Sequence, residues 1–252
     1  MSGELVVAVL SSTVALVSVA ISVWSARSTA RLQNELEERR RQATKEELVE
    51  EVMSRYREPL LRAAFDLQSR IYNIVGQRFL VRYLQCGDPA NQEYACRNTM
   101  FVVAEYLGWV EILRRGVQFL DLGDVRRNQL LVERLEAIGT ILSTDRQFQG
   151  AVPRMFRGEQ RAVGELMMQP AQAGESAAVG QCIGYAAFSA RLDQDPVFAH
   201  WFAPLERDIR QLAADPGPDH RRLVALQHAL LDLIDFLDDP PTRFPAEQRS
   251  RL

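Results

Sequence analysis

The sequence predicts an all-α protein with one N-terminal transmembrane helix, a charged helical stalk and a cytoplasmic bundle of about six to seven helices. An apolar run near the N-terminus is long enough to span a bilayer, and the remaining segments repeat their apolar positions at the helical period. No stretch alternates polar and apolar residues for long enough to predict a strand. We therefore expect four parts: an anchor at 1–25, a stalk at 26–58, a bundle domain at 59–238 and a disordered tail at 239–252.

The predicted membrane segment runs from Leu5 to Trp24, twenty residues without a charge. As a helix it would be about 30 Å long, which matches the hydrocarbon core of a bilayer. A cleaved signal peptide would carry a basic region before the apolar run, whereas the charged side chain found there is Glu4. Arg27 and Arg31 follow the segment, so the positive-inside rule places the short N-terminus outside the cell and the C-terminal domain in the cytoplasm.

Small residues recur along one face of this segment, at Ser11, Ala15, Ser18 and Ser22. Spacings of four, three and four residues bring them into line on a helix, where two backbones can approach closely. This pattern favours a homodimer in which the membrane helix continues into a coiled coil. A larger assembly that changes membrane permeability is a second interpretation of the same face.

Residues 26–58 are predicted to form one exposed helix, because they contain neither glycine nor proline and carry dense charges of both signs. Glu35 with Arg39, and Glu37 with Arg41, have the spacing and order that stabilise a solvated helix. We interpret this part as a stalk between the membrane and the bundle.

The bundle domain shows apolar residues at helical period, interrupted by proline- and glycine-rich breaks such as DPGP at 215–218. Pro59 suits the first turn of the first helix, and Asp124 is a plausible N-cap. The tail at 239–252 is polar and rich in proline, which predicts poor order. The expected helices cover about 59–84, 94–119, 124–145, 156–168, 179–192, 196–214 and 220–238.

Composition and motifs exclude several function classes. The formal net charge is −3 and the basic residues are scattered, so we expect no nucleic-acid partner. Cys86, Cys96 and Cys182 have no C-x-x-C spacing and indicate neither a disulfide framework nor a zinc site. Phosphate-binding, hydrolase, kinase and EF-hand motifs are missing, so we expect no cofactor and favour a protein that is not an enzyme.

A carboxylate within an apolar helix is the first candidate site. Glu105 is the only charged residue in the stretch 98–110, and a buried carboxylate needs a partner. Arg157 or Arg161 could supply a structural ion pair. In the alternative, an enzyme pocket between helices would be formed by Glu105, Arg157, Glu159, Arg161 and Glu165.

The second candidate is a polar stripe on the last predicted helix. His228, Asp232 and Asp235 stand at i, i+4 and i+7, an arrangement that could hold a divalent metal. The other face of this helix is rich in leucine, and a polar stripe opposite such a face normally meets water. We therefore predict no metal, with these three residues as the candidates if one binds.

Three segments carry a family resemblance: YREPLLRAAFDLQSRIYNI at 56–74, NTMFVVAEYLGWVEILRR at 98–115 and ALQHALLDLIDFLD at 225–238. They resemble a group of bacterial single-pass membrane proteins with a cytoplasmic helical domain. The resemblance implies the same anchored architecture. It implies no activity and no site residues, because none is assigned to that group.

Three functions are compatible with these observations. The first is a membrane-tethered interaction or sensor module that binds a cytoplasmic protein, because tethering raises the effective concentration of a domain near its partner. The second is an enzyme of unfamiliar class with the pocket around Glu105. The third is the oligomer that affects permeability. In each case the bilayer is an expected partner.

Overall fold

A computed structural model describes most of the chain after residue 55. The chain divides into two units, Met1–Glu50 and Glu51–Leu252. In the first unit the described residues are helical and exposed. The described residues are 24, 33, 35–41, 44, 56–117, 125–169, 180–215 and 217–252.

The predicted membrane segment falls almost wholly outside the described residues, since Trp24 is its one described position. The small-residue face at Ser11, Ala15, Ser18 and Ser22 also lies outside them. Within the part of the chain that is described, no helix is both long and apolar enough to cross a membrane.

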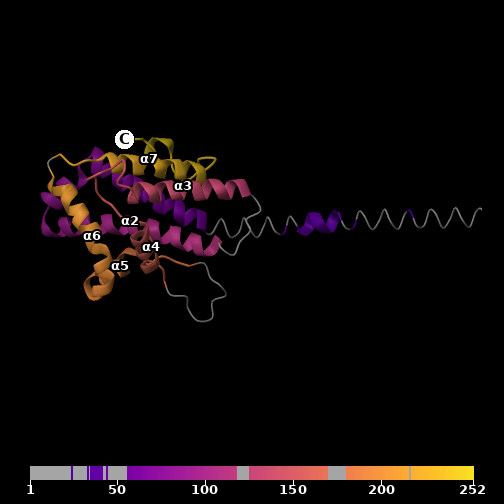
Figure 1. Ribbon diagram of the computed structural model, residues 1–252, viewed down its shortest axis with the longest axis horizontal. Helices are drawn as coiled ribbons and strands as arrows, with labels where there is room; N and C mark the ends of the chain where they lie inside the picture. The colour runs from indigo at the N-terminus through magenta and orange to yellow at the C-terminus, as the bar shows by residue number, and fades with distance from the viewer. Residues whose placement is uncertain are drawn as a thin grey trace, which may run out of the picture. The chain divides into compact units, whose positions relative to one another are not determined.

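The second unit is all-helical over its described residues, which confirms the predicted fold class. A helix covers residues 56–76 and is called helix 56–76 below. In Figure 1, α3 and α7 run side by side, and α5 and α6 lie together at the lower left. The further elements are the π-helix η1 (Val81–Gln85), α2 (Pro89–Val117), α3 (Val125–Ser143), α4 (Arg157–Leu166), α5 (Tyr185–Gln194), α6 (Pro196–Ala214), α7 (Arg221–Leu237) and the 3-10 helix η2 (Ala246–Gln248).

The first predicted helix, 59–84, is interrupted. Helix 56–76 stops before Arg78, which has a φ of 54°, in the left-handed region that ends a helix. The next helix, α2, begins at Pro89 rather than near Tyr94. The Asp88 carboxylate accepts the backbone N–H of Asn91 at 2.8 Å, and proline suits the first helical turn, so these two residues set the earlier start.

The helix predicted over 179–192 is shorter than expected. Residues 180–184 are extended instead, and α5 begins at Tyr185. The Gln169 N–H donates to the Gln181 carbonyl at 2.7 Å, and the Ile183 N–H donates to the Met167 carbonyl at 2.8 Å. These bonds to a distant segment compete with helix formation, which the glycines at 180 and 184 already disfavour.

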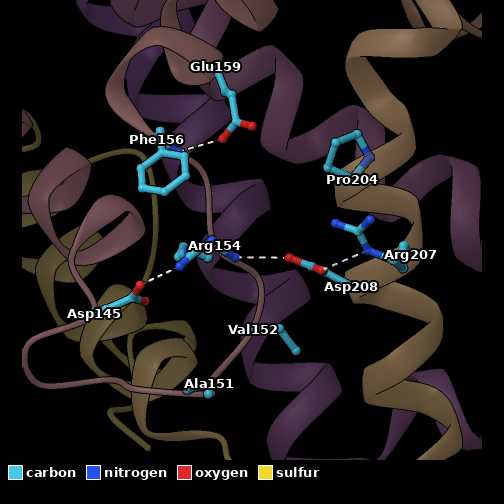
Figure 2. A pocket seen from close by; sticks show the side chains of 10 residues that line it. Asp145, Ala151, Val152, Arg154, Phe156, Glu159, Pro204, Arg207 and Asp208 are labelled. Atoms are coloured by element: carbon cyan, nitrogen blue, oxygen red, sulfur yellow. Dashed lines mark hydrogen bonds and ion pairs between the residues drawn. The ribbon is translucent and has the colours of Figure 1, made fainter.

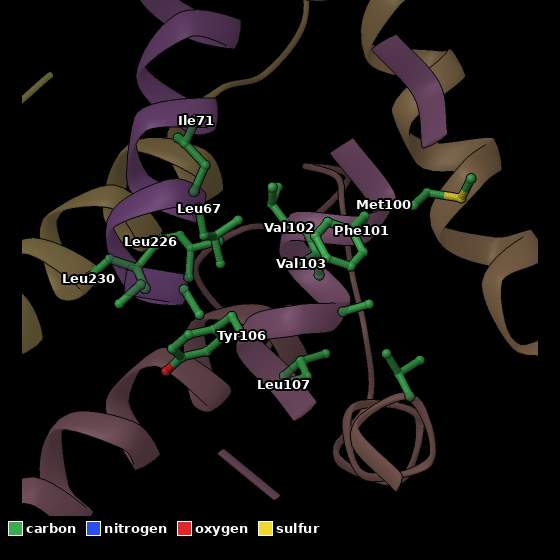
Figure 3. Packing of buried hydrophobic residues seen from close by; sticks show 14 of the residues in the cluster. Leu67, Ile71, Met100, Phe101, Val102, Val103, Tyr106, Leu107, Leu226 and Leu230 are labelled. Atoms are coloured by element: carbon green, nitrogen blue, oxygen red, sulfur yellow. The ribbon is translucent and has the colours of Figure 1, made fainter. Parts of the chain in front are cut away.

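The core lies where helix 56–76, α2 and α7 meet (Figure 3). Leu67 and Tyr106 are both 2% exposed, and Leu230 is completely buried. A second cluster of aromatic rings joins α2, α5 and α6, with Phe188 in edge contact with Phe101 and Phe202. Burial of such large side chains is the main stabilising contribution to the fold.

Helix α4 packs closely against α2 because Gly164 has no side chain. A Cβ at this position would lie 2.6 Å from the Leu107 carbonyl oxygen and 2.9 Å from the Glu111 Cβ. Such distances leave no room for a larger residue. The close approach brings the charged residues of α4 beside the end of α2.

The tail at 239–252, which the sequence predicts to be disordered, packs against the domain and ends beside α7 (Figure 1). Phe244 stacks on Phe65 with ring centroids 3.8 Å apart. The Gln227 amide donates to the Ser250 carbonyl at 2.8 Å, and Arg249 pairs with Asp238. The structure differs from the prediction because these partners belong to other helices, and local composition does not reveal them.

Candidate functional site

Glu105 lies partly buried on α2 and makes no ion pair with any described residue. Burial raises the pKa of its carboxyl to about 7, and the negative charge of Asp66 on helix 56–76 adds to the effect. The Cys182 thiol lies 3.8 Å from the Glu105 backbone carbonyl. The expected arginine partners are therefore not paired with this carboxylate, and the nearby charge that acts on it is that of Asp66.

The charged residues predicted around α4 have partners of their own. Arg157 binds the Glu136 carboxylate of α3 at 2.8 Å. Glu159 accepts the Phe156 N–H at 2.6 Å and so caps α4, while Arg161 is exposed. Glu165 meets Arg115 at 3.1 Å. Arg157 and Glu165 therefore join α4 to neighbouring helices, and the structure does not gather this group around Glu105.

The polar stripe on α7 faces residues of the tail. The His228 Nε2 atom lies 3.1 Å from the Leu252 carbonyl oxygen. Asp232 pairs with Arg251 at 2.5 Å, and Asp235 pairs with Arg249 at 2.9 Å. Among the described residues no group of three or more histidine, cysteine, aspartate or glutamate side chains is arranged to hold a metal ion.

Among the described residues three other carboxylates are buried, and two of them are compensated by arginines or backbone N–H groups. Glu111 is 3% exposed and binds Arg114 at 2.6 Å and Arg115 at 2.8 Å. Although burial opposes ionisation, these hydrogen bonds lower the pKa of Glu111. Asp238 is also buried, yet backbone N–H groups of the tail and the charge of Arg249 lower its pKa. Both are structural anchors.

Asp208 on α6 is the third buried carboxylate, and its compensation is weak. Its side chain is 9% exposed. One oxygen accepts the Arg154 backbone N–H at 3.0 Å, while the other lies 3.9 Å from the Arg207 Nε, beyond hydrogen-bonding distance. Burial raises the pKa of Asp208 despite these two neighbours. This carboxylate therefore has unused capacity to accept hydrogen bonds.

A fixed loop between α3 and α4 places the groups around Asp208. The completely buried Arg222 of α7 projects into this loop, and its guanidinium donates to the Ala151 carbonyl at 2.9 Å. The Arg154 side chain pairs with Asp145 and lies over the Phe156 ring, 4.5 Å from its centroid. The Arg222 guanidinium also donates to the carbonyls of Ile141, Leu142 and Phe148 and to the carboxylate of Asp145.

The loop and α6 line a cavity of about 180 Å³ that is open to solvent on one side, shown in Figure 2. Asp208 lies in its middle, between Arg154 and Arg207, and Phe156 and Pro204 stand on opposite sides. This volume is below the range of about 300–1,000 Å³ that is typical of small-molecule pockets. It has room for several water molecules or for the end of one side chain.

An exposed apolar stripe on α6 leads to this cavity. Val197, Trp201, Pro204 and Asp208 stand at i, i+4, i+7 and i+11, so they share one helix face. Val197 is 69% exposed and Trp201 is 40% exposed. Across the cavity Phe156 is 52% exposed. The exposed apolar residues of α6 repeat at the helical period, and so do its buried ones. The sequence alone therefore does not show which of the two faces is exposed.

A second cavity, of about 340 Å³, lies between α2, α5 and α6. Its basic residues are already paired: Arg97 binds Asp193 at 2.5 Å, and Arg210 binds Glu206 at 2.7 Å. Cys96 forms part of its wall, and burial raises the pKa of this thiol to about 11, so the reactive thiolate is scarce at neutral pH. The cavity beside Asp208 is the better candidate because its carboxylate is not satisfied.

Comparison of the chain with protein-family models, with curated proteins and with solved structures gave no match. The assignment of function therefore depends on the geometry of the α6 stripe and of the cavity beside Asp208.

Proposed function

We propose that this protein is a membrane-tethered helical interaction module that binds a cytoplasmic protein through its helical domain. The observation that carries the proposal is the exposed stripe of Val197 and Trp201, which ends at the cavity beside Asp208. Large apolar side chains exposed together commonly mark protein-interaction sites. The uncharged run 5–24 supplies the predicted anchor, with the domain on the cytoplasmic side.

The tether and the interaction can be tested together in cells. The full chain is compared with a chain that lacks residues 1–25 and with one in which an unrelated transmembrane helix replaces them. We expect the full chain to resist alkaline extraction from membranes and to form a crosslinked partner complex. Removal of the segment should reduce this complex by at least about tenfold, and the unrelated helix should restore it. Extraction of the full chain at alkaline pH would contradict the proposal.

A second candidate function, a sensor of pH, is favoured by Glu105 and Asp66. The two carboxylates lie on neighbouring helices, and burial of Glu105 together with the negative charge of the exposed Asp66 raises the pKa of Glu105, which has no ion-pair partner among the described residues. A carboxyl whose pKa is about 7 changes charge near neutral pH. Partner complexes of the wild type should then depend on pH between about 6 and 8, and those of Glu105→Gln should not.

A further inference from the structure

We propose that the partner segment inserts an arginine or lysine side chain into the cavity beside Asp208 while its apolar residues pack on the stripe of Val197, Trp201 and Pro204. This inference rests on the proposed interaction function and specifies the chemistry of the partner. It commits to a protein segment with a basic residue next to apolar ones, such as an amphipathic helix.

The incomplete pairing of Asp208 favours a basic occupant. The carboxylates of Asp145, Glu159 and Asp208 line the cavity together with the guanidiniums of Arg154 and Arg207. The buried Arg222 also pairs with Asp145, so Asp208, and not the sum of the charges, is the group that favours a basic side chain. Arg154 is committed to Asp145, whereas Arg207 is 75% exposed and 3.9 Å from Asp208. An incoming guanidinium or ammonium could donate to the Asp208 oxygen that lacks a hydrogen bond. Such a hydrogen bond between charged groups is stronger than one between neutral groups.

The dimensions also fit a side chain from a protein better than a free ligand. The cavity of about 180 Å³ is small, but the exposed stripe extends the available surface along α6. From Val197 to Asp208 the helix rises about 16 Å, which corresponds to about three turns of a partner helix. Trp201 near the middle of this stripe is the kind of residue that dominates binding energy at interfaces.

Site-specific photo-crosslinking in the native host tests the inference. The probe is p-benzoylphenylalanine, placed at position 201 of the full chain and, for comparison, at the exposed positions 83 and 132 on other elements. We expect position 201 to give a crosslinked peptide that contains arginine or lysine within about one helical turn of the attachment point. Attachment to lipid, to a segment without a basic residue or to a second copy of this chain would overturn the inference.

Charge and shape can then be tested separately with the mapped partner. Asp208→Asn should weaken its affinity by about tenfold or more, and Trp201→Ala should do the same. The matched controls are Asp232→Asn, which removes the same charge on α7, and Tyr83→Ala, which removes an exposed ring elsewhere; both should leave affinity unchanged. Circular dichroism of each variant verifies that the helical fold is retained. Equal affinities of wild type and Asp208→Asn would refute the inserted basic side chain.

A double-mutant cycle shows whether the two groups meet. Replacing the mapped arginine or lysine by glutamine should weaken binding about as much as Asp208→Asn, and the double variant should be no weaker than either single one. Additive losses would contradict direct contact. Crosslinks to one protein from position 83 or 132 but not from 201 would refute this inference and leave the interaction module standing. If none of the three positions gives a crosslinked protein, the result contradicts both this inference and the proposed interaction module.

Discussion

Glu111 and Asp208 are both buried carboxylates in one helical domain, but their surroundings differ. Glu111 lies at the end of α2, where Arg114 and Arg115 bind it and lower its pKa. Asp208 lies on α6 beside a cavity, with one backbone N–H as its hydrogen-bond donor, and burial raises its pKa. A carboxylate that is fully paired is costly to remove, because its partners lose the charge that compensates them. One that is partly paired and faces a cavity is available for binding, and it costs stability in the free protein.

The largest effect on the free energy of unfolding should come from Arg222, which holds the loop that lines the cavity. Arg222→Met would leave the carbonyls of the 141–151 segment without their buried donor, so we expect a loss of about 3–5 kcal/mol in the free energy of unfolding. Urea unfolding of the full chain in detergent measures it. The neighbouring Arg221→Met removes an exposed guanidinium that pairs with Asp219, and it should change the free energy of unfolding far less than Arg222→Met does. Similar losses for both variants would show that the buried contacts contribute little.

Loss of the buried Glu111 carboxylate should rank next. Glu111→Gln removes the charge that Arg114 and Arg115 share, but both arginines are partly exposed and Arg115 keeps Glu165, so we expect about 2 kcal/mol of destabilisation at neutral pH. Because the folded-state pKa of Glu111 is lowered, this contribution is present above the ordinary glutamate pKa and disappears as the pH falls through the lowered value. Glu165→Gln, at the half-exposed end of the same network, should cost less than about 1 kcal/mol.

Substitution of Glu105 should raise the free energy of unfolding instead of lowering it. Its pKa is raised from 4.5 to about 7, so the folded state binds the proton more tightly than the unfolded state, and stability falls as the pH rises between these values. Glu105→Gln removes this penalty and should stabilise the protein by about 1–3 kcal/mol at pH 8, with little change at pH 4. Unfolding curves at the two pH values measure the difference. An equal effect at both would contradict the raised pKa.

The smallest effect on stability is expected at Asp208, the partly paired carboxylate beside the cavity. Asp208→Asn keeps an acceptor for the Arg154 N–H and removes a charge that burial disfavours, so the free energy of unfolding should stay within about 1 kcal/mol of the wild type. The same urea experiment measures it beside Glu111→Gln. A loss as large as that of Glu111→Gln would place Asp208 among the structural anchors and remove its distinction as a binding group.

Local sequence determined much of the helical architecture. The bounds predicted for α6 agree with the structure, because Asp195, Pro196 and the break after Ala214 are local signals. Helix α5 and the tail were predicted less well. In both places hydrogen bonds to distant residues, such as that from Ile183 to Met167, replace the local preference.

The candidate site was less predictable than the helices. Glu105 stands out in an apolar stretch, and the structure shows it half-buried and without an arginine. Glu111 carries its own signal, since Arg114 and Arg115 follow at i+3 and i+4. The residues around Asp208 in α6 do not reveal its surroundings. Its hydrogen-bond donor is the backbone N–H of residue 154, which is distant in the sequence.

The sequence by itself determined the helical class and the order of the helices, because the period of apolar residues and the caps depend on near neighbours. It also determined the uncharged run that predicts an anchor. Only the tertiary structure decided that Glu111 and Asp238 are buried with their partners and that the buried Asp208 faces a cavity. Burial and pairing depend on residues far apart in the chain: Arg222 on α7 fixes the loop that brings Arg154 to Asp208 on α6.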